Sequence, residues 1–384
     1  MMGVISMKKQ LIGKLLVAVV AVAVMAVTYS KDIVVGQSVD LTGPLSGAGI
    51  PMRMGAQICF DMVNAAGGVN GQKIRFVTRD DNYKVAQTLS NVRDLISKED
   101  IVVLVGESGT ANNEALLKEK VLENANLAVV GPRTGATSLR QPFNPYMFHL
   151  RASYAQEIDK AVEYYTSIGS KKIGIVYQND AFGADVLTAA KAALKRVGVE
   201  PAFLATYERD SIKLEPAVKE ALGASPQAIL LLTTVAPAAT FVKLYREAGG
   251  AAQLMTLSIN DPDTIIKSVG IQHARGLTTT TVFPTPSRDD YPIVKEYHTA
   301  LKKYGPADAQ PNLSSFEGFL AGKVIVEALK KAGPNPTREK VMHSLENFTN
   351  VDLGGFRMNF GPKSRSGSSY VDISIISKDG RVLR

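Results

Sequence analysis

Two short polar segments of this chain carry the side chains best suited to hold an anion. Residues 107–110 read Glu-Ser-Gly-Thr and follow the apolar run 101–106, and residues 133–135 read Arg-Thr-Gly and follow the apolar run 127–131. Each segment leads into a predicted helix start, where unpaired backbone N–H groups attract negative charge. Helix capping would explain the Ser and Thr of either segment alone. Two such segments after consecutive strands favour a shared carboxylate site.

The first segment also raises a catalytic alternative. Ser108 lies between a predicted strand and a predicted helix, as the nucleophile of the G-x-S-x-G motif does, so it could serve a secreted serine hydrolase. However, Thr110 occupies the position of the second glycine, which that strained turn requires. A late histidine partner is not obvious either, because His343 falls inside a helical pattern. The residues therefore favour binding over catalysis.

Composition excludes several other kinds of site. The chain has a single cysteine, Cys59, and four scattered histidines, so disulfide frameworks, zinc sites and His-based metal sites are not expected. Neither a P-loop nor a G-x-G-x-x-G fingerprint occurs, and we expect no cofactor. The formal net charge is +8, but its charges are interspersed and form no basic stripe with aromatics, which argues against nucleic acid as a partner.

The elements that must position the polar segments alternate between strand and helix. Short apolar runs predict strands at 33–39, 73–78, 101–106, 127–131, 171–178, 228–233 and 276–282. Helical spacing predicts helices at 51–66, 84–98, 111–123, 153–167 and 181–197. This alternation predicts an α/β chain of two similar halves, before and after about residue 150, with helices covering parallel sheets. Ligands in such open sheets bind at the carboxyl ends of the strands, where both polar segments lie.

The first thirty residues differ from all that follow. Lys8, Lys9 and Lys14 precede an apolar run from Leu15 to Val27. The run is shorter than the roughly 20 apolar residues of a membrane-spanning helix, and the order of charge and apolar run is typical of a signal peptide. A retained anchor helix is the alternative. We expect residues 1–30 to be a signal peptide and the mature protein to be periplasmic.

Segments spread over nearly the whole mature chain resemble one protein family. They read IVVGQSVDLTGPLSGAG, DMVNAAGGVNGQKIRFVTRDDNY, VLVGESGTANN, AVVGPRTGATSLRQPFNPYMFHLRASY, KKIGIVYQNDAFG and FVKLYREAGG. In this order they resemble the type I periplasmic binding proteins of the branched-chain amino-acid ABC transporters, such as Leu/Ile/Val-binding proteins. The resemblance implies a small carboxylate or amino acid as ligand, no catalysis, and an inner-membrane ABC permease with its ATPase as partners. We expect a monomer.

The resemblance also implies an architecture of two Rossmann-like lobes joined by a three-crossover hinge, with the ligand cleft between them. We expect the crossovers near Arg151, Thr280 and Asn350. The first lobe would then comprise residues 31–150 plus 281–350, and the second residues 151–280 plus 351–384.

Ligand-binding positions follow from the same resemblance. The family's two carboxylate loops match 107–110 and 133–135, and Phe182 takes the aromatic position of its second-lobe motif. Ala48 stands where the family often has Tyr, and Ser258 aligns with the acid that holds an ammonium group, although Asp261 is near enough to substitute. The expected binding residues are Leu45, Ala48, Glu107, Ser108, Gly109, Thr110, Arg133, Thr134, Gly135, Phe182, Ser258 and Asp261.

Two ligand classes remain open on these residues. An amino acid needs an anion for its ammonium group, because a buried unpaired charge is very costly. Ser258 supplies none, and Asp261 fits the Asn-Asp-Pro turn equally well. Arg133, in contrast, could clamp a carboxylate through two hydrogen bonds. We therefore favour a hydrophobic or aromatic carboxylate over a branched-chain or aromatic amino acid.

Overall fold

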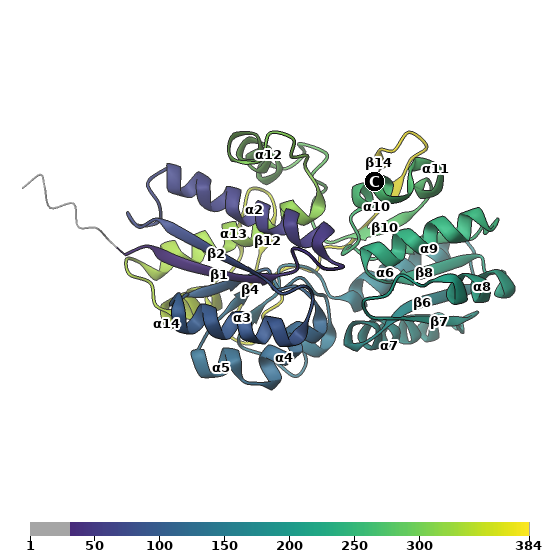
Figure 1. The fold of residues 1–384 in the computed structure, drawn as a ribbon, viewed down its shortest axis with the longest axis horizontal. Coiled ribbons are helices and arrows are strands. Elements are labelled where there is room, and N and C mark those ends of the chain that lie inside the picture. The colour runs from purple at the N-terminus through teal and green to yellow at the C-terminus, as the bar shows by residue number, and fades with distance from the viewer. Residues whose placement is uncertain (1–30, 384) are drawn as a thin grey trace, which may run out of the picture. The chain divides into compact units, whose positions relative to one another are not determined.

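Two main sheets, each flanked by helices, organise residues 31–383, the part of the chain that this computed structural model describes (Figure 1). The first sheet is parallel, in the order β2-β1-β3-β4-β5. Its strands are β1 (Ile33–Val39), β2 (Ile74–Asp80), β3 (Val103–Val105), β4 (Val129–Val130) and β5 (Met147–Phe148). The predicted α/β class is confirmed. The predicted signal peptide, residues 1–30, lies outside the described residues.

The second sheet has the order β14-β13-β10-β9-β8-β6-β7. Its parallel strands are β6 (Ile173–Asn179), β7 (Leu204–Glu208), β8 (Ala228–Leu232), β9 (Gln253–Thr256) and β10 (Thr278–Thr281). Two antiparallel strands from the end of the chain, β13 (Asp372–Ile376) and β14 (Val382–Leu383), extend it beside β10. A separate hairpin pairs β11 (Val351–Asp352) with β12 (Arg357–Met358).

Helices pack on both faces of the two sheets. Those of the first sheet are α2 (Ser46–Ala65), α3 (Val85–Lys98), α4 (Thr110–Lys118), α5 (Val121–Ala125), α12 (Pro292–Tyr304), α13 (Leu313–Ala332) and α14 (Arg338–Glu346), with the short 3-10 turn η1 (Thr137–Leu139). Those of the second are α6 (Tyr154–Ser167), α7 (Ala181–Arg196), α8 (Glu215–Ala224), α9 (Val235–Glu247), α10 (Pro262–Val269) and α11 (Ile271–Ala274). None of the helices within residues 31–383 is both long enough and apolar enough to cross a bilayer.

Alternating strand residues face different cores, as burial on both faces of a parallel sheet requires. Val35 points into a cluster with α2 and α13, whereas its neighbour Val34 points into a cluster with α3 and α5. The second of these clusters continues into the second sheet through Ile175. Val176 faces a third cluster beneath α8 and α9. The continuous apolar strand runs in the sequence reflect this two-sided burial.

Two helices that lie far apart in the sequence meet in the first cluster. Figure 1 shows α13, from late in the chain, beside α2 near its start, and their residues form the most extensive helix–helix contact of the described chain. The backbones approach closely: a Cβ atom added to Gly55 would overlap the Ser315 carbonyl oxygen, and one added to Gly318 would overlap that of Met52. The first sheet is therefore completed by residues from the last quarter of the chain.

The packing corrects one predicted lobe boundary. We assigned residues from 351 onward to the second lobe, but Leu353, Phe356, Met358 and Phe360 pack in the same cluster as α2 and α13. The next strand, β13, pairs with β10 in the second sheet. Tyr370 and Val371 also pack against the first cluster, so the chain reaches the second sheet only at β13. The other predicted lobe limits stay a prediction.

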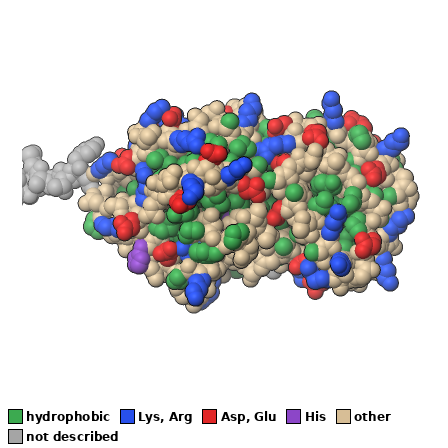
Figure 2. All heavy atoms as spheres, turned by 90° about the horizontal axis from the view of Figure 1, so that it is seen from below, with side chains coloured by type: hydrophobic (Ala, Val, Ile, Leu, Met, Phe, Trp, Pro, Cys, Tyr) green, Lys and Arg blue, Asp and Glu red, His purple; other side chains and the backbone are tan. Residues whose placement is uncertain are grey.

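Charged side chains of both signs are scattered over the face that Figure 2 shows. On the face seen from below in Figure 2, Lys and Arg side chains are interspersed with Asp and Glu. That face carries no continuous basic stripe of the kind that tracks a nucleic-acid backbone.

Candidate functional site

A cavity opens where loops of the two sheets meet, at the carboxyl ends of parallel strands. Its wall includes residues that follow β2, β3 and β4 of the first sheet and β6, β8 and β9 of the second. The lining residues are Leu45, Ala48, Tyr83, Gly109, Thr110, Arg133, Tyr154, Phe182, Thr234, Val235 and Ile259.

Half of the twelve predicted binding residues line this cavity. They are Leu45, Ala48, Gly109, Thr110, Arg133 and Phe182. Five other lining residues were not predicted from the sequence: Tyr83, Tyr154, Thr234, Val235 and Ile259. Thr234 and Val235 directly follow the predicted strand at 228–233, so the strand-end rule that selected the first two polar segments could have found them.

Arg133 is the one charged side chain among the described residues that line the cavity. It is 6% exposed. Its Nη2 donates hydrogen bonds to the Ile259 carbonyl oxygen (2.8 Å) and to Ser314 Oγ (3.2 Å). Nε, in contrast, is buried and has no hydrogen-bond partner among the described residues. Burial lowers the pKa of Arg133, but a guanidinium stays charged in proteins. This buried cation thus lines the cavity and can act on an anion there.

Behind Arg133, a second arginine already occupies the nearest carboxylate. Arg151 Nε and Nη2 donate to the two oxygens of Glu317 at 2.9 and 3.1 Å. Arg133 reaches the same carboxylate only at 3.6 Å, through Nε. All three side chains are at most 6% exposed. Two buried guanidinium groups therefore share the Glu317 carboxylate, while Glu157 also acts on Arg151 and Asp261 on Arg133.

The two predicted carboxylate loops lie side by side. Ser108 and Arg133 pair as a parallel β-bridge, and the hydroxyls of Thr110 and Thr134 are 2.8 Å apart. Gly109 has a φ of +92°, which lets the chain turn directly into α4 at Thr110. Of these, Gly109 and Thr110 reach the cavity together with Arg133.

Four predicted residues of these loops play supporting parts. Ser108 and Thr134 are buried behind the cavity wall. Gly135 makes room for Tyr154, because an added Cβ would lie 2.7 Å from that residue's backbone nitrogen. Glu107 accepts a hydrogen bond from the Ser38 backbone N–H at 2.9 Å, and burial raises its pKa well above the ordinary value. None of the four lines the cavity.

The two residues proposed to meet an ammonium group do not line the cavity either. Ser258 lies beneath Arg133, and its backbone N–H donates to Glu157 Oε2 at 2.9 Å. Asp261 caps α10: its Oδ1 accepts from the backbone N–H groups of Asp263 and Thr264, and its Oδ2 accepts from that of Leu313 at 2.9 Å. This carboxylate is occupied by backbone donors. Consequently, no acidic side chain lines the cavity within the described residues.

Aromatic rings close the opposite wall. Phe182 is 2% exposed and meets the ring of Tyr154 edge-on, with centroids 5.3 Å apart. It lies in the first turn of α7, which Asp180 caps by accepting from the Gly183 backbone N–H at 3.1 Å. The cavity thus combines one cation with apolar and aromatic surface.

Comparison with known proteins places this architecture in a family. A family model described as periplasmic binding protein matches residues 32–381. A substrate-binding periplasmic protein of Ralstonia solanacearum, known as a crystal structure, is 41% identical, with a TM-score of 0.89 over 92% of this chain and 99% of that one. The Leu/Ile/Val-binding protein homolog 7 of Brucella melitensis is 26% identical, over 85% of this chain and 83% of its own.

A more distant structure shares the fold. The fatty acid ABC transporter substrate-binding protein from Thermomonospora curvata is 22% identical, with a TM-score of 0.83 over 92% of both chains. The resemblance noted in the sequence is confirmed, since the family model spans nearly all described residues. This chain belongs to the type I periplasmic binding proteins, in the group that serves branched-chain amino-acid transporters.

Proposed function

We propose that this protein is the extracytoplasmic solute-binding component of an ABC importer and captures a small hydrophobic or aromatic carboxylate. The observation that carries the proposal is the charge of the cavity wall, where Arg133 is unaccompanied by any acid among the described lining residues. The relatives support the general role. They include a homologue named for Leu, Ile and Val and a structure named for fatty acids, so the ligand class must be argued from the cavity itself.

A carboxylate is the group that this wall can neutralise. Arg133 brings a guanidinium to the cavity wall, and charge-assisted hydrogen bonds from a guanidinium to a carboxylate are among the strong ones in proteins. The hydroxyl of Thr110, at the first turn of α4, adds a donor on the same side. The remaining wall, with Leu45, Phe182 and Val235, suits an apolar or aromatic body.

An amino acid fits the same wall less well. Its ammonium group would be buried in a cavity whose described lining holds no carboxylate, since Asp261 caps α10 and does not line the cavity. Removing a cation from water without a partner is costly. A branched-chain or aromatic amino acid therefore stands as the second candidate.

Capture without turnover is the mechanism we propose. Residues from both sheets complete the cavity, so ligand would enter when the two sets of loops separate and be enclosed when they meet. Ser108, the candidate nucleophile of a hydrolase, lies behind the cavity wall and bridges to Arg133. This position does not favour the serine hydrolase alternative.

A matched panel of ligands tests the proposed class. We expect 3-phenylpropanoate or 4-methylpentanoate to bind with micromolar affinity in isothermal titration calorimetry. Phenylalanine and leucine, which differ from these acids by one ammonium group, should bind about 10- to 150-fold more weakly, since leaving a charged group unpaired costs roughly 1.5–3 kcal/mol. Micromolar binding of the two amino acids with none of the acids would overturn the ligand class. No binding by any of the four would overturn the proposed function of the cavity.

Export is the second expected property. We propose that residues 1–30 are removed on the way to the periplasm, as the Lys-led apolar run indicates. N-terminal sequencing of protein from a periplasmic extract should give a start between Val27 and Asp32. A full-length product in the membrane fraction would contradict this.

A further inference from the structure

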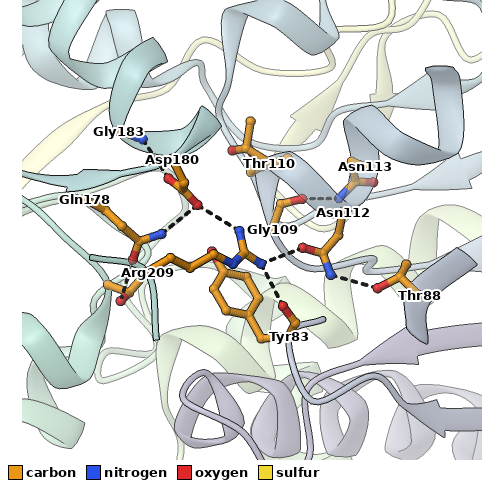
Figure 3. A network of polar contacts seen from close by, with 12 residues as sticks. Tyr83, Thr88, Gly109, Thr110, Asn112, Asn113, Gln178, Asp180, Gly183 and Arg209 are labelled. Atoms are coloured by element: carbon orange, nitrogen blue, oxygen red, sulfur yellow. Dashed lines mark hydrogen bonds and ion pairs between the residues drawn. The ribbon is translucent and has the colours of Figure 1, made fainter. Parts of the chain in front are cut away.

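Arg209, just after β7 of the second sheet, contacts residues that follow strands of both sheets, close to the cavity (Figure 3). Its Nη1 donates to Asp180 Oδ2 at 2.8 Å, on its own side. Its Nη2 donates to the Tyr83 carbonyl oxygen at 2.7 Å and to Asn112 Oδ1 at 2.9 Å, both on the side of the first sheet. The guanidinium carbon also lies 3.6 Å from the centre of the Tyr83 ring, a close cation–π contact.

The partners on the first sheet connect Arg209 to the carboxylate loop. The Tyr83 ring lines the cavity and presses on Gly109, where an added Cβ would lie 2.7 Å from the ring. Asn112, in the first turn of α4, also donates a buried hydrogen bond to Thr88 Oγ1 at 2.7 Å, which fixes its side chain. Arg209 thus contacts Tyr83 and Asn112, the two residues whose side chains lie against Gly109.

The backbone at Tyr83 is held in an unfavourable conformation. Asn82 and Tyr83 have φ values of +49° and +57°, and a bulky residue rarely adopts this left-handed region. Such strain persists where surrounding contacts over-determine the conformation. Two contacts do so here: the Tyr83 backbone N–H donates to Asp81 Oδ1 at 2.9 Å, and its carbonyl accepts from Arg209.

On the second sheet, Arg209 is fixed beside the other cavity wall. Asp180 accepts from Arg209 and from Gln178 Nε2 (2.7 Å), and it caps the helix turn that carries Phe182. Only 18% of the Arg209 side chain is exposed, so the ion pair with Asp180 is partly shielded from solvent. The ion pair with Asp180 therefore orients the guanidinium of Arg209 toward Tyr83 and Asn112.

We infer that Arg209 is a latch that holds the cleft closed over a bound carboxylate and positions Tyr83 as its wall. The inference rests on the proposed function, because a latch requires that the lobes separate to admit ligand. On separation Asp180 moves with Arg209, whereas Tyr83 and Asn112 stay with the first sheet. Both cross-sheet hydrogen bonds and the ring contact are then lost together. Because Arg209 does not line the cavity, it stabilises the closed form without selecting the ligand.

Dissociation kinetics of the Arg209→Gln variant test this inference. The probes are 3-phenylpropanoate and phenylalanine. Stopped-flow measurements should show that the variant releases each probe about 10- to 100-fold faster than wild type, because apparent affinity falls in proportion to the population of the closed form. The association rate should stay within about threefold, since most interface changes act on dissociation. The ratio of the affinities for the two probes should not change.

Two further variants separate a latch from a local stabilising contact. Arg209→Lys keeps the charge but cannot bridge Asp180, Tyr83 and Asn112 together, so it should also release faster. Arg196→Gln removes an exposed ion pair with Asp159, which joins α7 to α6 away from the first sheet. This variant should release the probe at the wild-type rate. Unchanged release from Arg209→Gln, with wild type binding a probe, overturns the latch alone. Failure of wild type to bind either probe overturns the proposed function instead.

Discussion

Replacing Arg133 with methionine should greatly weaken the binding of 3-phenylpropanoate. The substitution removes the cation of the cavity wall while keeping a long apolar side chain. Truncating one member of a buried charge pair costs about 2–5 kcal/mol, which corresponds to roughly 30- to 5000-fold in Kd. Calorimetric titration of the purified variant measures the loss directly.

The stability of the same variant shows that the effect is local. Glu317 keeps both of its hydrogen bonds with Arg151 when Arg133 is absent, so the thermal midpoint should stay within a few degrees of wild type. Arg133→Lys retains the charge but not the planar guanidinium. Its affinity for 3-phenylpropanoate should fall between those of wild type and Arg133→Met. Arg246→Gln, which removes an arginine bound to the Gly250 carbonyl away from the cavity, is the matched control. Binding by Arg133→Met within threefold of wild type would refute the role of Arg133.

Glu317→Gln should have the largest effect on folding. It leaves Arg133 and Arg151 buried side by side without their shared carboxylate, although the new side chain has nearly the same shape. Breaking a buried ion pair by neutralising one partner costs about 3–5 kcal/mol of unfolding free energy. A saturating acid ligand should restore part of this loss, because its carboxylate supplies a negative charge at Arg133.

An exposed ion pair provides the comparison. Lys98→Gln removes the pair with Asp94 on α3, where the side chains are 65% and 40% exposed. Such surface pairs contribute about 0–1 kcal/mol. Urea unfolding of both variants, with and without 3-phenylpropanoate, separates the two cases. If Glu317→Gln were as stable as Lys98→Gln, the Glu317 carboxylate would not be needed to stabilise the buried Arg133 and Arg151, and the prediction would be wrong.

The regular elements of this fold were largely predictable, because strands buried on both faces produce short apolar runs with helical spacing between them. The predicted strand at 276–282 contains β10, and the predicted helix at 84–98 contains α3. The predicted helix at 111–123 is instead broken into α4 and α5, because Lys120 has a φ of +53°. Nothing in the residue types announces that break, since lysine is an ordinary helix former.

The candidate site was predictable on the first sheet and less so on the second. Gly109, Thr110 and Arg133 follow strands whose carboxyl ends meet at one sheet edge, which is a local property of the sequence. Tyr83 reaches the cavity through two consecutive left-handed residues, a backbone choice that spacing does not reveal. Asp261 could be a ligand or a helix cap on sequence alone, and only the structure shows that it accepts from three backbone N–H groups.

The contact between α2 and α13 has a consequence for when the chain can fold. The first sheet cannot bury its α2 face until α13 has been synthesised, and the second sheet lacks two edge strands until β13 and β14 follow. Contacts between such distant segments form slowly, because a long loop must close before they are made. A ribosome-bound chain of this topology therefore remains incompletely folded almost to its last residue. That delay would keep the chain incompletely folded during the export proposed above.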